Sequence, residues 1–561
     1  MPVQSSPQAM RPAVPPSTAL RTVAELTGAC PLPRAGHSDA ELTDIVVTGI
    51  EQRSNAVQPG DLFAGLAGAK AHGARFAADA VARGAVAVLT DPAGAESLGE
   101  LGVPVLVHDT PRAVLGELSA AIYGYPSRQL RVVGITGTSG KTTTAYLVEA
   151  GLAAAGNRVA LLGTIETRIG GERVPSALTT PEAPQLHALF AVMVERGVEA
   201  VVMEVSSHAL ALGRVDGVEF GVGAFTNLSQ DHLDFHADFE DYFAAKRRLF
   251  EPSSPVAAEI SVLCVDDAWG RRLAREISGR AAVVTVAGGP GTDSGSDTPD
   301  WSVPGPITVH DTGQEFTVLG PDGEIDVRLR LPGRYNVANA VLAVAVCAAA
   351  GADPAAAAAA LAEVDVPGRM QRVEAGQDFL AIVDYAHKPA AIESVIATLR
   401  KHLEHSAGDA EPGRLAVVVG AGGDRDTGKR PLMGAAAARG ADLLIITDDN
   451  PRSEDAAAIR AAVRAGAEAL ADAERGEVRE IGDRRDAIAA AVDWARAGDV
   501  VLVAGKGHET GQEIAGVKHA FDDREVLAAA LYRKSAAPSG AAHVPTDSRR
   551  SAPDSKDLTV S

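Results

Sequence analysis

Short apolar runs alternate with helix-like segments along most of the chain. In its first part, strands are expected at residues 45–47, 85–89 and 103–107, and helices at 77–83 and 112–123. This alternation is typical of α/β domains, in which helices pack on a largely parallel sheet. A Tyr-Gly-Tyr-Pro run at 123–126 interrupts the pattern, so we place a domain boundary after it.

The same alternation continues in two further stretches. Strands are expected at residues 132–135, 158–162, 200–203 and 223–226, and then at 380–383, 415–419, 443–447 and 500–503. A Val-Pro-Gly-Arg run at 366–369 predicts a linker between the two stretches. The Ala-rich apolar segment 337–350 ends at a Gly-Ala-Asp-Pro run and is shorter than the ~20 apolar residues of a membrane span, so we expect a buried helix.

These patterns predict an α/β fold with three domains, at residues 26–126, 127–366 and 367–535, the last of them doubly wound. The Pro- and Ser-rich residues 1–25 and the weakly apolar residues 536–561 are expected to be disordered. The N-terminal residues contain no apolar signal-peptide core, and we find no membrane-spanning segment. We therefore expect a cytoplasmic protein, and a monomer.

Charge and cysteine content narrow the function classes. The chain has 52 basic and 73 acidic residues and a formal net charge of −21. This excess argues against nucleic acid or an anionic membrane as a general partner, although small anionic ligands need only local cations. The three cysteines, Cys30, Cys264 and Cys347, are far apart, so they form neither a metal-ligand pair nor a disulfide framework, and a reducing compartment fits.

A glycine-rich loop follows the strand expected at 132–135 and leads into Lys141-Thr142-Thr143 and a helical pattern. A strand, a glycine-rich loop, Lys-Thr and a helix together can hold a nucleoside triphosphate, because backbone N–H groups, the helix N-terminus and the lysine all face the phosphates. Ile135 stands where the common P-loop has its first glycine, so this is a variant loop. The alternative is a tight strand–helix turn that binds nothing.

Three further polar positions follow or flank apolar runs. Glu204 ends the strand expected at 200–203, a position suited to a second Mg²⁺ ligand, although a surface carboxylate is the alternative. His232 lies in the polar run 226–236 and could ligate a metal or be structural. Lys246 lies in an amphipathic segment, where helix geometry alone predicts a solvated ammonium with its stem packed on the core.

A set of motifs extends these observations. In chain order they are ITGTSGKTTT, LTTPEAP, MEVSSHAL, FTNLSQDHLDFH, YFAAKRRLF, GRYNVANA, GRMQRVE, VDYAHKPAA, GAGGDRDTGKRPLM, TDDNPRSED and AGKGHE. Together they resemble the Mur ligases, and among them the ligases that add the third residue of the peptidoglycan stem peptide, over roughly residues 40–530. The resemblance implies the three-domain Mur ligase architecture with a central P-loop domain. It also implies an ATP- and Mg²⁺-dependent ligase that joins diaminopimelate to UDP-N-acetylmuramoyl-L-alanyl-D-glutamate through an acyl-phosphate.

The resemblance assigns roles at the nucleotide. The residues implied to bind ATP are Gly137, Thr138, Ser139, Gly140, Lys141, Thr142, Thr143, Asn336, Asp384 and His387. Those implied to hold Mg²⁺ are Thr142, Glu204, His232 and Lys246, the last as a carbamate that replaces a cation with an anion. Lys141, Glu204, His232 and Lys246 are the implied catalytic residues.

The resemblance also assigns the two other substrate sites. The residues implied to bind the UDP-muramoyl-dipeptide are Ser54, Thr179, Thr180, Ser206 and Arg214. Those implied to bind diaminopimelate are Arg425, Asp449, Asn450, Pro451, Arg452, Gly505 and Glu509. A guanidinium such as Arg452 can hold the extra carboxylate that distinguishes diaminopimelate from lysine, and Glu509 suits a substrate ammonium.

The sequence departs from the family on the nucleotide-sugar side. Arg53 and Asn55 flank Ser54 where the family usually has Asp and Arg, and Leu178 and Leu212 stand where Asn and Gln are common. These departures suggest weaker binding of the nucleotide-sugar or a somewhat altered acceptor. Two alternative functions are another ligase of this superfamily, such as a folylpolyglutamate synthetase or the D-alanyl-D-alanine-adding Mur ligase, and a nucleotide-binding regulator without ligase activity. The DNPR run and Glu509 argue against the first, and the second predicts a dispensable Lys246.

Overall fold

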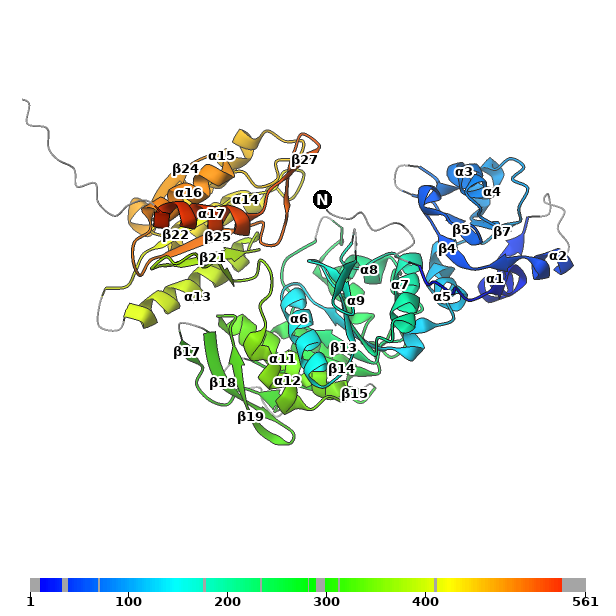
Figure 1. Ribbon diagram of the computed structural model, residues 1–561, viewed down its shortest axis with the longest axis horizontal. Helices are drawn as coiled ribbons and strands as arrows, with labels where there is room; N and C mark the ends of the chain where they lie inside the picture. The colour runs from blue at the N-terminus through cyan, green and yellow to red at the C-terminus, as the bar shows by residue number, and fades with distance from the viewer. Residues whose placement is uncertain are drawn as a thin grey trace, which may run out of the picture.

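The computed structural model describes residues 11–32, 39–68, 71–174, 178–232, 235–280, 282–288, 298–310, 313–407 and 411–536. Three α/β units follow one another along an elongated molecule, with the N-terminal and C-terminal units at opposite ends (Figure 1). The predicted α/β fold with three domains is confirmed.

The first unit is built on a five-stranded sheet in the order β2-β7-β6-β5-β4. Its strands are β2 (Cys30–Pro31), β4 (Gly49–Glu51), β5 (Asp61–Gly65), β6 (Ala87–Thr90) and β7 (Val105–Val107). Its helices are α1 (Leu20–Thr27), α2 (Asp39–Asp44), α3 (Ala77–Ala82), α4 (Pro92–Ser97) and α5 (Pro111–Ile122). The pattern at 45–47 corresponds to β3 (Val46–Val47), which pairs with β1 (Thr18–Ala19) outside this sheet.

The expected disorder of residues 1–25 is wrong for residues 11–25. Helix α1 buries Leu20 and Val23, and Arg11 bonds to Asp61, so apolar packing and a long-range ion pair order this segment. Residues 1–10 lie outside the described residues. At the other end, Ala536 is the last residue of α17 (Asp523–Ala536), and the rest of the predicted disordered tail also lies outside them.

The central unit contains a twelve-stranded sheet whose middle is parallel. Across the sheet the long parallel strands are β9 (Val159–Leu162), β12 (Ala200–Glu204), β8 (Arg131–Thr136), β13 (Val222–Phe225), β14 (Ile260–Cys264) and β15 (Ala282–Ala287), and the short β16 (Trp301–Ser302) pairs parallel with β15. The remaining strands are β10 (Thr167–Ile169), β11 (Glu172–Val174), β17 (Thr308–His310), β18 (Gly313–Gly320) and β19 (Gly323–Leu329). Neighbouring residues of β8 point to opposite faces, so Val132 and Val133 belong to two different cores.

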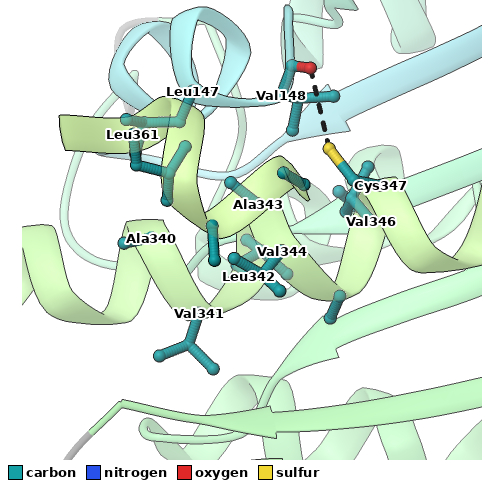
Figure 2. Packing of buried hydrophobic residues seen from close by; sticks show 14 of the residues in the cluster. Leu147, Val148, Ala340, Val341, Leu342, Ala343, Val344, Val346, Cys347 and Leu361 are labelled. Carbon is teal, nitrogen blue, oxygen red and sulfur yellow. Dashed lines mark hydrogen bonds between the residues drawn. The ribbon is translucent and has the colours of Figure 1, made fainter. Parts of the chain in front are cut away.

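Helices cover both faces of this sheet. One face carries α6 (Lys141–Ala154), α11 (Arg334–Ala349) and α12 (Pro354–Ala360), and the other carries α7 (Ala183–Glu195), α8 (Ser207–Ala211), α9 (Phe239–Arg247) and α10 (Ala268–Ile277). Helix α11 is the buried helix expected at 337–350. It packs against Leu147 and Leu361, and the Cys347 thiol lies 3.6 Å from the Val148 carbonyl (Figure 2). Within the described part of the chain, every helix is too short or too polar to span a membrane.

The third unit is doubly wound, as predicted. Its six-stranded sheet has the order β20 (Gln371–Arg372), β21 (Leu380–Asp384), β25 (Val500–Ala504), β22 (Leu415–Val419), β23 (Leu443–Ile446) and β24 (Glu477–Glu480). Helices α13 (Pro389–Ala407), α14 (Lys429–Gly440) and α15 (Ala456–Glu468) pack on one face, and α16 (Arg484–Trp494) and α17 pack on the other. A hairpin of β26 (Gly511–Ile514) and β27 (Val517–Ala520) lies beside the sheet.

Parallel sheets determine where the candidate chemistry lies. In an open α/β sheet, ligands bind at the carboxyl ends of the strands. The loops that follow β8, β12 and β13 in the central unit, and β21, β23 and β25 in the third unit, carry most of the predicted site residues.

Candidate active site

The glycine-rich loop joins β8 to α6 in the way the sequence predicts. Gly137 has φ 146° and Gly140 has φ 87°, in the region that favours glycine. A Cβ atom at Gly137 would lie 1.9 Å from Thr226 Oγ1, and one at Gly140 would lie 2.4 Å from Asn339 Oδ1. Both glycines are therefore required by the backbone conformation and by the close packing of the loop.

The loop that follows β13 supports this turn. Asn227 Oδ1 accepts a hydrogen bond from the Ser139 backbone N–H at 3.0 Å, and Asn227 Nδ2 donates to the Ser139 carbonyl at 2.9 Å. The Thr226 hydroxyl donates to the same carbonyl at 2.7 Å. Side chains that follow β13 thus fix the backbone conformation of the glycine-rich loop.

Two lysines meet on one carbonyl of the loop. Lys141 Nζ donates to the Gly137 carbonyl at 2.9 Å and Lys246 Nζ donates to the same oxygen at 2.9 Å. The solvated Lys246 that helix geometry alone predicts is wrong, because α9 turns this side chain inward and it is 1% exposed. Burial lowers the pKa of Lys141 to about 8, and burial together with the Lys141 charge lowers the pKa of Lys246 well below its usual value.

A buried carboxylate lies beside the start of α6. Glu204, at the end of β12, is 1% exposed, which excludes the surface carboxylate alternative. The Thr142 hydroxyl lies 3.0 Å from both Glu204 carboxylate oxygens. The Thr164 backbone N–H and hydroxyl donate to the same carboxylate at 2.8 and 3.0 Å. Thr142 and Glu204 are therefore adjacent, as a shared Mg²⁺ site requires.

His232 lies on the segment that follows β13, and its ring centroid is 6.1 Å from that of Tyr242. Its backbone has φ 54°, a conformation that non-glycine residues adopt mostly at functional or strained positions. Its Nε2 lies 3.2 Å from Asp231, and Asp231 pairs with Lys388 of the third unit at 2.5 Å. Partial burial lowers the pKa of His232 to about 4, so the imidazole is neutral at neutral pH and has a free electron pair for a metal.

Only some of the predicted Mg²⁺ ligands are side chains that commonly bind metal ions. Among the described residues, no three His, Cys, Asp or Glu side chains are grouped so that they could hold a metal ion. The predicted set instead combines a carboxylate, a hydroxyl and an imidazole with a modified lysine. Lys246 fits the modification, because a buried amine with a lowered pKa is neutral enough to react with CO₂.

Four of the residues predicted to bind the UDP-muramoyl-dipeptide lie close to Glu204. Thr179 Oγ1 is 3.2 Å from Thr164 Oγ1, and the Thr180 hydroxyl donates to the Glu204 carbonyl at 2.9 Å. The Ser206 backbone N–H donates to Thr180 at 3.1 Å. The fourth, Arg214, approaches the Thr180 carbonyl at 3.5 Å. This cluster places predicted acceptor-substrate groups next to the predicted metal ligand.

The fifth predicted residue, Ser54, belongs to the first unit. It begins a short 3₁₀ turn, Ser54–Ala56, directly after β4. The atypical Arg53 pairs with Glu51 at 2.8 Å, and Gln185 of α7 donates to Glu51 at 2.8 Å. This bond is a direct link between the Ser54 turn and the central unit.

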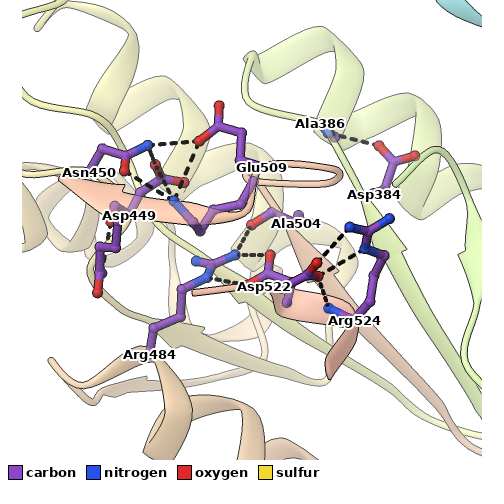
Figure 3. A network of polar contacts seen from close by, with 12 residues as sticks. Asp384, Ala386, Asp449, Asn450, Arg484, Ala504, Glu509, Asp522 and Arg524 are labelled. Atoms are coloured by element: carbon purple, nitrogen blue, oxygen red, sulfur yellow. Dashed lines mark hydrogen bonds and ion pairs between the residues drawn. The ribbon is translucent and has the colours of Figure 1, made fainter. Parts of the chain in front are cut away.

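Three of the residues predicted to bind ATP lie outside the glycine-rich loop. Asn336 accepts a hydrogen bond from Asn339 at 3.1 Å, and Asn339 also packs against the glycine-rich loop. Asp384 is buried and accepts a hydrogen bond from the Met370 backbone N–H at 2.7 Å. It also accepts one from the Ala386 backbone N–H at 2.7 Å (Figure 3), and these bonds hold the turn that follows β21. His387, three residues on, has a pKa that burial lowers to about 4.

The third unit gathers most of the residues predicted to bind diaminopimelate. Asn450 Nδ2 donates to Asp449 and to Glu509, both at 2.9 Å (Figure 3). A Cβ atom at Gly505, which has φ 116°, would lie 2.9 Å from Asp449 Oδ2. Lys506 is fully buried beneath them, and its ammonium lies 3.1 Å from Asn450 Oδ1 and 3.4 Å from Glu509 Oε2.

Arg452 lies at the edge of this group and is fixed by its backbone. It has φ 53°, and its N–H donates to the Glu513 carbonyl of β26 at 3.0 Å. Its guanidinium donates to the Gly423 carbonyl at 2.6 Å and lies 3.6 Å from the Glu513 carboxylate. Pro451 is buried beside it, whereas Arg425 is exposed on the loop between β22 and α14.

Comparison with known proteins places this geometry in a family. Three family models match the chain: the Mur ligase family catalytic domain at residues 46–123, the Mur ligase middle domain at 135–347, and the Mur ligase glutamate ligase domain at 368–507. A UDP-N-acetylmuramoyl-L-alanyl-D-glutamate--2,6-diaminopimelate ligase of Corynebacterium efficiens is 55% identical over 485 residues, which cover 85% of this chain and 89% of that protein. The chain belongs to the Mur ligase family. The resemblance found in the motifs is thereby confirmed.

Other members of the Mur ligase family support the same placement. The enzyme of the same name from Streptomyces coelicolor is 54% identical over 487 residues, covering 86% of this chain and 92% of that protein. A solved structure of a ligase of that name has a TM-score of 0.63 at 31% identity, covering 93% of this chain and all of the other. MurF from Acinetobacter baumannii, at 17% identity and a TM-score of 0.60 over 92% of this chain and 99% of its own, shares the fold.

In this Mur ligase, sequence reasoning missed several residues of the candidate site. Thr164 follows the end of β9, a strand that neighbours β12, so its hydroxyl could have been identified as another group at the same sheet edge. Asn339 and Asn227 could have been read from the motifs GRYNVANA and FTNLSQDHLDFH. Lys506 lies inside AGKGHE, but nothing in the sequence indicates that its side chain is buried.

Proposed function

We propose that this Mur ligase uses ATP to join diaminopimelate to UDP-N-acetylmuramoyl-L-alanyl-D-glutamate, a step of peptidoglycan precursor synthesis. The relatives named for this reaction are 53–55% identical over more than four fifths of the chain. The observation that carries the amino-acid assignment is that Arg452 and Glu509 both follow the carboxyl ends of strands in one sheet, β23 and β25. Arg452 can take the distal carboxylate of diaminopimelate, and Glu509 can take an ammonium.

In the first step, the transfer of a phosphoryl group from ATP, some residues bind the ATP phosphates and others would hold Mg²⁺. The glycine-rich loop offers backbone N–H groups to the ATP phosphates, and Lys141 is placed to leave its two loop carbonyls and bind the β- and γ-phosphates. Thr142, Glu204, His232 and the carbamate of Lys246 would hold Mg²⁺. When bound, that ion would neutralise charge on the phosphoryl group being transferred.

The carbamate of Lys246 has a defined chemical origin. The neutral amine attacks CO₂, a C–N bond forms and one proton leaves, so a buried amine becomes an anion. The low pKa of Lys246 supplies the neutral amine, and the Lys141 ammonium nearby favours the anionic product.

The amide bond then forms in two steps. The D-glutamate γ-carboxylate attacks the γ-phosphorus of ATP, which gives an acyl-phosphate and ADP. The diaminopimelate amine attacks the acyl carbon, loses a proton and expels phosphate. An acyl-phosphate hydrolyses readily, so the third unit must cover the site during turnover, and the Lys388–Asp231 ion pair is one contact between the two units at this place.

The test is phosphate release from ATP with the UDP-muramoyl-dipeptide and either diaminopimelate or lysine. We expect turnover with diaminopimelate and a discrimination against lysine on the order of 10⁴-fold, because lysine offers no second carboxylate to Arg452. An Arg452→Met variant should lose most of this discrimination, and Arg439→Met on the distant end of α14 is a matched control. Equal turnover with both amino acids in the parent enzyme would contradict the assignment of the amino acid. ATP turnover that is indifferent to any amino acid would favour a regulator over a ligase.

A further inference from the structure

The N-terminal strap, which we define as residues 11–19, connects the first two units. Its C-terminal end forms β1, which pairs with β3 of the first unit. The backbone N–H groups of Ala13 and Val14 both donate to the Glu195 carboxylate at the end of α7, each at 2.9 Å. The strap is therefore bonded to the first unit and to the central unit at the same time.

Arg11 inserts its guanidinium between acidic groups of the first unit. It forms a two-point hydrogen bond with Asp61, at 3.0 and 2.9 Å, and donates to the Tyr123 hydroxyl. The Glu51 carboxylate lies 3.9 Å away. Both carboxylates are 3% exposed and Arg11 itself is 14% exposed, so water contributes little to stabilising these charges.

The first unit leaves space for this guanidinium. Gly49, the first residue of β4, has no side chain, and a Cβ atom there would lie 2.2 Å from Arg11 Nη1 and 2.3 Å from Asp61 Oδ1. A larger residue at position 49 would displace the arginine. The fit of the glycine, the two carboxylates and the tyrosine indicates a site built to receive Arg11.

Glu51 connects this site to the turn that carries Ser54. Its carboxylate accepts from the backbone N–H groups of Gln52 and Arg53 at 3.0 and 3.1 Å, and it holds the Arg53 guanidinium at 3.0 and 2.8 Å. Gln185 of α7 donates to the same carboxylate at 2.8 Å. Glu51 thus sets both the shape of the Arg53–Ser54 turn and its distance from the central unit.

We propose that Arg11 is a positioning residue for the nucleotide-sugar site. It compensates Glu51 and Asp61, which lets Glu51 hold the turn of Arg53 and Ser54 toward the UDP-muramoyl-dipeptide. With Arg11 and Arg53 present, the two carboxylates are balanced. Without Arg11 a net negative charge remains beside a substrate that carries a diphosphate and a carboxylate, and the turn loses its support. This inference rests on the proposed function, because it takes Ser54 to face that substrate.

The experiment measures the binding of UDP-N-acetylmuramoyl-L-alanyl-D-glutamate by calorimetry to the full-length protein. Arg11→Met keeps most of the side-chain volume and removes the charge. We expect its Kd for the nucleotide-sugar to rise at least about tenfold, which corresponds to about 1.4 kcal/mol, while the Kd for ATP changes less than about twofold. Arg21→Met, in the exposed Arg21–Glu25 pair of α1, is the matched control and should bind both ligands like the parent.

The outcomes separate the inference from the proposed function. Failure of the parent protein to bind the nucleotide-sugar would refute the proposed function. Binding by the parent with an unchanged Kd in Arg11→Met would refute the inference alone, as would an equal loss of affinity for ATP and the nucleotide-sugar. If Arg11→Met does not fold, the same binding measurement on Glu195→Gln tests the inference. This variant weakens the hydrogen bonds between Glu195 and the N-terminal strap and leaves the contacts of Arg11 intact. We expect a smaller rise in the nucleotide-sugar Kd for that variant, and no rise would overturn the inference.

Discussion

Replacing Lys506 by Met tests whether the buried ammonium organises the proposed diaminopimelate pocket. Lys506 lies between Asn450 Oδ1 at 3.1 Å and Glu509 Oε2 at 3.4 Å, and its side chain is fully buried. Methionine fills a similar volume without the charge. Asn450 keeps its bond from the Glu513 backbone N–H at 2.9 Å, so the pocket should persist with its polar groups less well aligned.

The expected magnitude follows from these contacts. A hydrogen bond to a charged group contributes about 1.5–3 kcal/mol. Glu509 is 33% exposed, so solvent screens part of its interaction with Lys506. We therefore expect a loss of about 1–2 kcal/mol in amino-acid binding, which is a rise of about 5–30-fold in the KM for diaminopimelate. The KM values for ATP and for the UDP-muramoyl-dipeptide should stay the same.

The assay is steady-state phosphate release with each substrate varied in turn. Lys518→Met removes the same charge from an exposed position on β27 and serves as the control. An unchanged KM for diaminopimelate in a folded Lys506→Met enzyme would refute the reasoning. A uniform rise in all three KM values together with a lower Tm would mean that Lys506 acts on stability alone.

Three further results are expected. Lys246→Ala should be inactive. When bicarbonate is added to CO₂-depleted buffer, only the parent enzyme should gain activity. A parent enzyme whose activity does not depend on bicarbonate would argue against the carbamate. Thr164→Val should raise the Mg²⁺ concentration for half-maximal activity about 10–100-fold, whereas Thr164→Ser should resemble the parent, because only valine lacks the hydroxyl that holds Glu204. Burial lowers the pKa of His187 to about 4. Between about pH 6.5 and pH 4 the unfolded chain therefore binds a proton that the folded chain does not. The free energy of unfolding should decrease by roughly 3 kcal/mol as the pH is lowered through this range. His187→Gln should flatten this part of a plot of Tm against pH, and parallel curves would show that another group is responsible.

Local signals identified the glycine-rich loop and many of the parallel strands, but not β4, β5, β14 or β15. Buried parallel strands appear as apolar runs, and the groups that follow them share one edge, which is why Lys141, Thr142 and Glu204 could be grouped before the structure was known. The motifs added the metal-binding roles that the family resemblance implies for His232 and Lys246. Helix periodicity alone gave the wrong environment for Lys246, because an amphipathic pattern does not show how deep a residue at the edge of the apolar face will lie.

Long-range partners explain what could not be predicted. Arg11 lies in a Pro-rich segment with little apolar periodicity, and it is ordered by residues 50 and 112 positions away in the chain. Lys506 lies among small and polar residues, and its burial depends on Asn450, 56 positions away. Thr164 contacts Glu204 because β9 and β12 are neighbours in space, although 40 positions separate the two residues.

The molecule is modular, because each of its three units is built on a main sheet of its own. The residues predicted to bind diaminopimelate lie within the third unit, so exchanging residues from about 370 onward between related ligases should transfer amino-acid preference to the recipient. Such an exchange must preserve two contacts near the junction between the central and third units. Gly368 has φ 65°, and a Cβ there would lie 2.1 Å from the His508 backbone nitrogen, while Lys388 must still meet Asp231. A chimaera that keeps these contacts is a practical route to cell-wall precursors with non-natural third residues.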